Sequence, residues 1–318
     1  MYINKGDKLP RIGFGEGIVE IGKLSSKVVV LGADITASVG LNGFAETFPD
    51  RFFSFGIAEQ NVAAVAAGMA LTGKVPVFST YGVFAALRAA DQIRLSICYN
   101  NVKVMIGGAY AGISVGPDGA THQALEDIAY IRALPNMTLI SPCDANQTRV
   151  ATIEAFKNIE GPVYIRFGRE PVLNFTEEEQ EFVIGRGQTL RHGTDVTIVA
   201  TGNMVWEALQ AAEMLKDRGI NAQVINIHTI KPIDSELLIQ AARETGAVVT
   251  VEEHQVNGGL GSAVAEVLVR NFPVPMEIVG MPDCFGESGT PAELLQKYGL
   301  NSGNIAQKVF DVIKRKRV

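Results

Sequence analysis

The stretch Phe53-Ser54-Phe55-Gly56-Ile57-Ala58-Glu59-Gln60-Asn61 runs directly into Val62-Ala63-Ala64-Val65-Ala66-Ala67-Gly68-Met69-Ala70. A polar loop with one carboxylate thus opens into small apolar residues, which favours a closely packed helix that is buried over most of its surface. Glu59 is then expected at or just before the helix N-terminus. It is either a first-turn carboxylate that complements the helix dipole, or a semi-buried acid that donates and accepts protons. The stretch alone favours the first interpretation.

Composition limits the class of protein. The chain has 318 residues, 47% of them hydrophobic and 19% charged, which predicts a globular protein of about two domains. A net charge of −6 argues against nucleic acid as the main partner. The three cysteines and four histidines show no metal-ligand spacing, so we expect no metal site built by this chain alone. No signal peptide precedes Leu9 and no apolar run approaches a membrane span, so we expect a cytoplasmic protein without membrane contact.

Alternating apolar runs and amphipathic segments predict an α/β fold with a buried parallel sheet. In the first part we expect strands at 27–32, 74–80, 102–107, 137–141 and 161–167, and helices at 15–24, 85–99, 124–132 and 145–158. An acidic stretch at 176–181 indicates an exposed linker. The predicted domains are therefore 1–175 and 189–318, joined by a linker at 176–188. The second domain, a smaller α/β unit, is expected to be architectural and to contribute to subunit contacts.

Several polar and aromatic residues follow the predicted strands, where open α/β sheets place ligands. Asp34 and Ser38 come after the first strand, although Asp34 could equally be the N-cap of the next segment. Tyr81 and Phe84, three residues apart, belong either to the core or to the border of a cleft, where they could stack on a flat ring. Arg166 and Arg169 lie at the end of the strand at 161–167; we expect one to be an anion anchor and the other a surface residue.

A glycine-rich loop at 107–123 is long for a connection inside a compact domain, which indicates a function. It contains Asp118 and His122. We expect His122 at the start of the helix at 124–132, where the dipole favours the neutral imidazole, a group that can bind a hydroxylated substrate. The glycine spacing fits neither a P-loop nor a dinucleotide-binding motif.

Two motifs, Gly56-Ile57-Ala58-Glu59-Gln60-Asn61 and Asp118-Gly119-Ala120-Thr121-His122-Gln123, resemble those of the transketolase family, and more narrowly its C-terminal half. The resemblance covers almost the whole chain. It implies a thiamine diphosphate pyrimidine-binding domain followed by a smaller transketolase C-terminal domain. It also implies that Glu59 contacts the aminopyrimidine ring nitrogen of thiamine diphosphate and so promotes formation of the thiazolium ylid.

The same resemblance assigns roles to further residues. Tyr81 and Phe84 would pack on the pyrimidine, and Asp34 would lie beside the cofactor. Arg11, Ser38 and Arg169 would contact the sugar phosphate, and Asp118 and His122 would contact substrate hydroxyl groups. His122 is also expected to be catalytic, together with Glu59. The family commonly has a histidine twelve residues before His122, where this chain has Tyr110, a bulkier substrate-binding candidate that is not cationic at neutral pH.

The family binds the diphosphate and its metal through a Gly-Asp-Gly segment and a later Asn, and this chain has no Gly-Asp-Gly. We therefore expect an N-terminal transketolase subunit to hold the diphosphate and its Mg²⁺ or Ca²⁺. The assembly would be an α2β2 heterotetramer containing a homodimer of this chain. The implied reaction is transfer of a two-carbon ketol unit between sugar phosphates, as in pentose phosphate chemistry. Alternatives are a 1-deoxyxylulose-5-phosphate synthase-like enzyme, a 2-oxo acid dehydrogenase beta subunit, or a non-catalytic regulatory partner.

Overall fold

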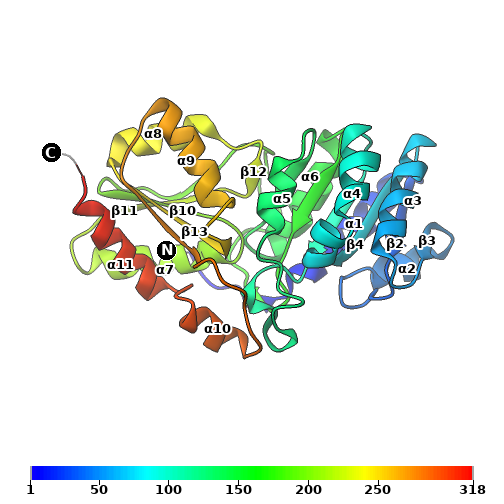
Figure 1. The fold of residues 1–318 in the computed structure, drawn as a ribbon, viewed down its shortest axis with the longest axis horizontal. Coiled ribbons are helices and arrows are strands. Elements are labelled where there is room, and N and C mark those ends of the chain that lie inside the picture. Colours follow the sequence, from blue (N-terminus) through cyan, green and yellow to red (C-terminus); the bar gives the residue numbers. More distant parts are fainter. Residues whose placement is uncertain (1, 317–318) are drawn as a thin grey trace.

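The chain forms two α/β halves, each built on one sheet, in a computed structural model that describes residues 2–316 (Figure 1). The first half contains a seven-stranded sheet that is parallel except at one edge. Its strands, in spatial order, are β12 (Thr229–Lys231), β6 (Thr138–Ile140), β7 (Val163–Arg166), β5 (Met105–Ala109), β4 (Val75–Tyr81), β2 (Val28–Gly32) and β3 (Phe52–Ser54). The α/β class predicted from the sequence is therefore confirmed.

Helices cover both faces of this sheet. They are α1 (Pro10–Leu24), α2 (Asn42–Thr47), α3 (Glu59–Leu71), α4 (Ala90–Gln92), α5 (Asp127–Ala133) and α6 (Ala145–Asn158), with π-helical turns η2 (Phe84–Arg88) and η3 (Ile93–Tyr99) and 3-10 turns η1 (Pro49–Arg51) and η4 (Ile113–Asp118). All five residues of β2 are buried, and alternate ones face opposite layers: Val28 and Val30 pack toward α1, and Val29 and Leu31 toward α3. Burial on both faces explains why β2 is an unbroken apolar run.

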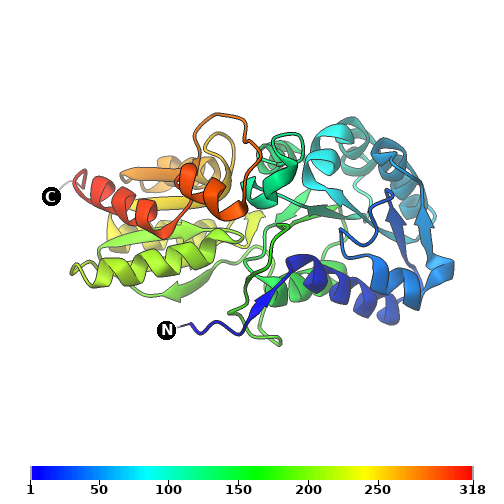
Figure 2. The ribbon, with the colours of Figure 1, turned by 90° about the horizontal axis from the view of Figure 1, so that it is seen from below.

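The second half contains a five-stranded sheet in the order β14 (Met276–Met281), β13 (Val248–Gln255), β10 (Val196–Ala200), β11 (Ala222–Asn226) and β9 (Gln188–Arg191). All pairs are parallel except β9 with β11. Its helices are α7 (Met204–Lys216), α8 (Ser235–Thr245), α9 (Leu260–Asn271), α10 (Pro291–Lys297) and α11 (Ser302–Ile313). A short N-terminal strand, β1 (Asp7–Lys8), pairs with β8 (Val172–Leu173), and Figure 2 shows this dark-blue segment beside the junction of the halves.

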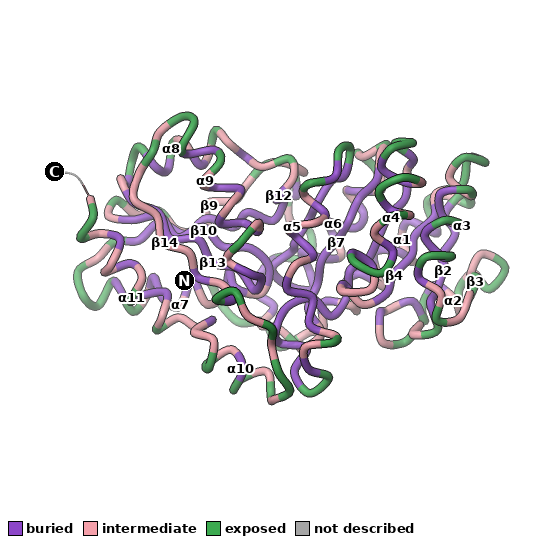
Figure 3. The backbone as a smooth tube through the Cα atoms, in the orientation of Figure 1, coloured by how far each residue is buried: buried purple, intermediate pink, exposed green. Residues whose placement is uncertain are grey.

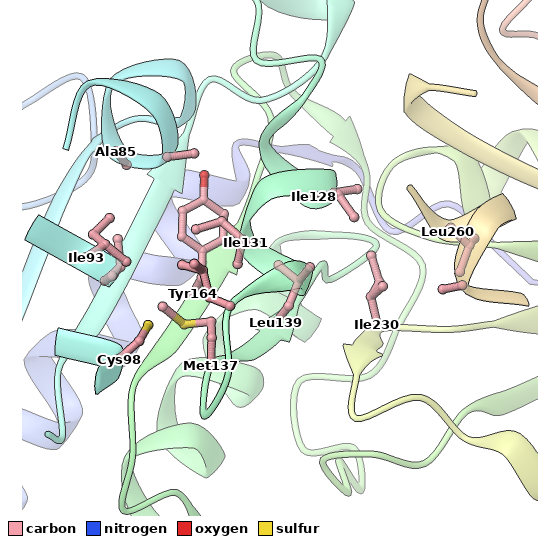
Figure 4. Packing of buried hydrophobic residues seen from close by; sticks show 14 of the residues in the cluster. Ala85, Ile93, Cys98, Ile128, Ile131, Met137, Leu139, Tyr164, Ile230 and Leu260 are labelled. Carbon is pink, nitrogen blue, oxygen red and sulfur yellow. The ribbon is translucent and has the colours of Figure 1, made fainter. Parts of the chain in front are cut away.

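The two halves share a strand and a core. β12 belongs to the second half of the sequence, yet it pairs antiparallel with β6 at the edge of the first sheet. One apolar cluster continues across the junction, and Figure 4 shows Ile128 of α5, Ile230 of β12 and Leu260 of α9 within it. The buried backbone is likewise continuous between the halves in Figure 3. The first sheet is therefore completed only by residues from beyond the predicted linker.

Some elements differ from the sequence predictions. α1 begins at Pro10 and not at residue 15, so Arg11 lies in its first turn. The helix predicted at 85–99 consists mainly of π-helical turns, and α5 begins at Asp127 and not at residue 124. Within residues 2–316, the structure contains no helix of the length and apolar character that a membrane crossing requires.

Candidate active site

Glu59 is the first residue of α3, as predicted, and its side chain is only 3% exposed. Its two carboxylate oxygens lie 3.0 and 3.1 Å from Nη1 of Arg88. The prediction that this helix is buried over most of its surface is wrong for the chain by itself. α3 buries the face that carries Val62 and Ala66 and exposes the face that carries Leu71, since alanine-rich helices are apolar all round and do not reveal which side is covered.

Arg88 reaches Glu59 from η2, the π-helical turn that follows β4. π-helical turns are rare and often occur at functional sites. The Arg88 guanidinium also lies 3.9 Å from the centroid of the Phe84 ring, in cation–π geometry. Sequence reasoning missed Arg88; the available signal was its position four residues after Phe84, one turn along the same segment.

Four aromatic rings gather at the carboxyl ends of β4 and β5. Tyr81 stacks on Tyr110 with ring centroids 4.2 Å apart, and the Phe84 ring lies 5.9 Å from Tyr81. The His122 imidazole meets Tyr81 and Phe84 edge-on at 5.7 and 5.4 Å. Burial raises the pKa of the Tyr81 phenol, and the nearby Ser38 side chain acts in the opposite direction. The structure therefore brings Ser38 to the same cluster.

His122 does not start a helix. It lies in a turn, hydrogen-bonded through Nδ1 to Thr121 Oγ1 at 2.9 Å, and α5 begins only at Asp127. The expectation that a helix dipole acts on His122 is therefore wrong. Between His122 and α5, Ala124 instead forms an isolated parallel bridge with Ala111.

Arg169 and Arg11 lie beside the glycine-rich loop at 107–123. Arg169 Nη1 is 3.3 Å from Asp118 Oδ1 and donates to the Val115 carbonyl at 2.8 Å. Its guanidinium lies 5.3 Å from the Tyr110 ring centroid, and Arg11 Nη1 donates to the Arg169 carbonyl at 3.4 Å. These contacts place two partly exposed guanidinium groups beside the loop.

Arg166 is neither an anion anchor nor a surface residue, so the prediction for this position is wrong. Its side chain is 5% exposed and paired with Asp127 at 2.9 Å. A charged side chain that is buried at the junction of the two halves needs a partner of opposite charge. The sequence did not indicate that Asp127 is the partner of Arg166.

Asp34 lies at the carboxyl end of β2 with a left-handed backbone (φ 69°), and its side chain is exposed. The N-cap alternative is wrong, because the next helix, α2, begins at Asn42 after Leu41. Asp34 thus shares the sheet edge with the other candidates without a described contact to them.

Comparison with known proteins agrees with this architecture. Residues 11–173 match the transketolase pyrimidine-binding domain, and residues 185–305 match the transketolase C-terminal domain. The chain is 44% identical to a putative transketolase C-terminal section from Methanocaldococcus jannaschii, covering 96% of both chains. It is 42% identical to the 6-deoxy-6-sulfo-D-fructose transketolase subunit SqwH of Clostridium sp. (strain MSTE9), covering 94% of this chain and 92% of that one.

A solved structure described as an inactive β4 tetramer of a split-gene transketolase superposes with a TM-score of 0.90 at 48% identity, covering 98% of this chain and all of that one. By fold and by sequence, the chain belongs to the transketolase family. Within that family it comprises the C-terminal section, with the pyrimidine-binding and C-terminal domains in the order predicted from the motifs.

Proposed function

We propose that this chain is the C-terminal subunit of a thiamine diphosphate-dependent transketolase that transfers a two-carbon ketol unit between phosphorylated sugars. The observation that carries this proposal is the juxtaposition of a buried carboxylate, Glu59, with the rings of Phe84 and Tyr81 at one sheet edge. A flat heteroaromatic ring suits aromatic neighbours, and a ring nitrogen suits a buried carboxyl group. These residues therefore fit the pyrimidine end of thiamine diphosphate.

When bound, thiamine diphosphate supplies a nucleophilic thiazolium carbon. Glu59 would hold a proton at its carboxyl group toward the ring nitrogen, while Phe84 and Tyr81 pack against the ring and exclude water. In the chain by itself the Glu59 carboxylate is paired with the Arg88 guanidinium. Glu59 must therefore leave or share this ion pair before it can contact the ring nitrogen.

The residues around the glycine-rich loop would bind the sugars. Arg11 and Arg169, with Ser38, are suited to a phosphate group, since guanidinium groups bind phosphate through paired hydrogen bonds. Asp118 and His122 would bind hydroxyl groups, with Tyr110 packed beneath. Asp34 would lie at the cofactor's side of the same edge.

We further propose that an N-terminal subunit supplies the diphosphate and metal site, with Mg²⁺ or Ca²⁺, in an α2β2 assembly. Several relatives are named as one part of a divided transketolase. Among them is an apulose-4-phosphate transketolase subunit from Phocaeicola vulgatus, which is 38% identical over 96% of this chain and 97% of that one. Residues 2–316 contain no group of three or more His, Cys, Asp or Glu side chains placed to hold a metal ion.

The test is Glu59→Ala in the enzyme reconstituted with its N-terminal subunit. Turnover should fall by about 100-fold or more, because positioned proton transfer contributes on the order of 10²–10⁴ in rate. Glu126→Ala is a matched control, since Glu126 is a partly buried carboxylate outside the cluster. Wild-type turnover in Glu59→Ala would contradict the assignment, as would tight magnesium-dependent binding of thiamine diphosphate to the isolated chain in calorimetry.

The second candidate is a 1-deoxyxylulose-5-phosphate synthase reaction. The synthase of Desulforudis audaxviator is 38% identical over 96% of this chain, which spans 48% of that protein. Release of CO₂ from a 2-oxo acid donor by the reconstituted enzyme would favour this candidate. Ketol transfer from a ketose phosphate without CO₂ release would favour transketolase.

A further inference from the structure

The second domain contributes a buried carboxylate, Glu253, to the junction between the halves. Glu253 lies on β13 and is 3% exposed. Its neighbour Glu252 is also buried but acts within its own domain, where it accepts hydrogen bonds from the Leu260 and Gly261 amides at the start of α9. Glu253 instead points at the glycine-rich loop of the first domain.

Both oxygens of the Glu253 carboxylate are bonded. Oε1 accepts from the backbone N–H of Ser114 at 2.6 Å, and Oε2 accepts from Nδ2 of Asn203 at 2.9 Å. Asn203 directly precedes α7 of the second domain. Oε2 of Glu253 is therefore bonded within its own domain, whereas Oε1 is bonded to the loop of the first domain. Hydrogen bonds to an ionised acceptor are stronger than neutral ones, and inside a protein their loss is costly.

The loop rests directly on this carboxylate. Gly112 has φ 90°, and a Cβ added there would lie 2.3 Å from Cδ of Glu253. Only glycine permits both the left-handed backbone and this approach. Two residues further on, Ser114 lies within η4, the turn that begins at Ile113 and ends at Asp118.

The backbone of Glu253 is tied to the same region. Nη2 of the buried Arg166 donates to the Glu253 carbonyl at 2.8 Å and to the Ala124 carbonyl at 3.2 Å, so it joins β13 to the far end of the loop. The second domain also reaches the loop through Glu287, whose carbonyl accepts from Gln123 Nε2 at 2.9 Å. The loop is thus held at both ends by the second domain.

We propose that Glu253 is a positioning residue that fixes the loop 112–118, so that the second domain governs sugar recognition without touching the sugar. This rests on the proposed function, which places Asp118 and His122 at the substrate. The described side-chain partners of Glu253 do not include Glu59, Phe84 or Tyr81, so we expect the cofactor residues to keep their places when the Glu253 contact is lost. Burial raises the pKa of the Glu253 carboxyl group, and the hydrogen bond from the Ser114 N–H opposes this rise only in part.

The experiment uses the full chain, reconstituted with its N-terminal subunit, carrying Glu253→Ala, Glu253→Gln or the control Glu252→Gln. Three quantities are measured: amide hydrogen exchange at Ser114, the KM and kcat for ketose phosphate donors, and thiamine diphosphate affinity by calorimetry. Glu253→Ala should speed exchange at Ser114 and raise KM about tenfold, as expected for loss of a hydrogen bond to a charged group. The cofactor affinity should stay within about twofold, because no cofactor group is proposed at this contact.

Glu253→Gln keeps one acceptor oxygen and the side-chain volume, so its KM and its Ser114 exchange should lie between those of Glu253→Ala and the wild type. This variant decides the matter if Glu253→Ala does not fold. Unchanged Ser114 exchange and KM in an active Glu253→Gln enzyme would overturn the proposal, as would an equal rise in KM in Glu252→Gln. If the wild-type enzyme transfers no ketol unit, the proposed function fails, whereas Ser114 exchange still decides whether Glu253 holds the loop.

Discussion

At the start of α3, the Glu59 carboxylate faces the Arg88 guanidinium and not water. Arg88 also packs on Phe84, so the arginine occupies the space between two residues assigned here to the pyrimidine ring. A ligand that uses Glu59 must displace this ion pair. The Arg88 side chain is 46% accessible, so water can solvate its guanidinium, whereas the Glu59 carboxylate is 3% exposed and needs the ligand as its new partner.

Arg88→Gln is therefore expected to strengthen thiamine diphosphate binding to the reconstituted enzyme. The gain should be about three- to fivefold, because a half-exposed ion pair contributes at most ~1 kcal/mol. Calorimetric titration measures it, with Arg94→Gln, an exposed position on η3, as the control. Weaker binding in Arg88→Gln would show that the arginine supports the cofactor and does not compete with it.

Tyr110 stands where the resemblance to the family leads us to expect a histidine. It is 7% exposed, stacks on Tyr81 and lies 5.3 Å from the Arg169 guanidinium. Tyr110→His should change the ratio of kcat/KM values among ketose donors by about tenfold and leave thiamine diphosphate affinity unchanged, because Tyr110 belongs to the glycine-rich loop and has no described contact with Glu59. Tyr99→His, at an exposed tyrosine, is the control. Identical donor ratios in Tyr110→His and wild type would remove Tyr110 from the site.

Among the elements, α1 and α6 show how glycine sets the distance between layers. A Cβ at Gly13 would lie 2.0 Å from the Ala145 carbonyl oxygen, and one at Gly17 would lie 2.8 Å from Cβ of Thr152. The two helices therefore touch backbone to backbone. This contact holds the first turn of α1, which carries Arg11, against the rest of the domain.

Gly13→Ala should destabilise the chain by roughly 1–3 kcal/mol, as overpacking does in other cores. Gly68→Ala is the matched control: it lies in helix α3 with nothing within 4 Å of its Cβ position, so it should be neutral or slightly stabilising. Thermal unfolding midpoints of the two variants measure the difference. A Gly13→Ala chain as stable as Gly68→Ala would mean that α1 can shift away from α6 at no cost.

The local amino-acid pattern was sufficient to predict some helices and strands and not others. The apolar run of β2 and the helix α6, whose N-cap Asp144 accepts from the Gln147 amide, have their signals within the segment itself. β12 has no such signal, because its three residues form a strand only against β6. The π-helical turns around Phe84 and Arg88 could not be predicted from the sequence either, because the same amino acids are equally compatible with an ordinary α-helix.

In the whole molecule, the candidate residues come together because parallel strands end at one edge. Tyr81 is the last residue of β4, and Tyr110 and Arg169 follow β5 and β7; their places at strand ends could be predicted from the sequence. The contacts between the two halves could not be predicted from the sequence. Glu253 and Arg166 are buried charges whose partners lie far away in the sequence, so only the folded chain pairs them.

Because the halves share β12, an apolar cluster and buried hydrogen bonds, we expect the full chain to unfold in one calorimetric transition. Two independent domains would give two transitions, each with its own midpoint. The calorimetric enthalpy should equal the van't Hoff enthalpy if unfolding is cooperative. Two peaks separated by about 10 °C or more would show that the shared strand does not couple the halves.

The edge position of β12 also matters while the chain is being made. The edge of β6 that β12 covers is open until residue 231 has left the ribosome, which takes several seconds after residue 175 at ~5–20 residues per second. During that interval the nascent first domain presents unpaired backbone groups, a template on which another chain can add a strand. Folding yield should therefore be most sensitive to translation speed and to chaperones while residues 175–231 are synthesised.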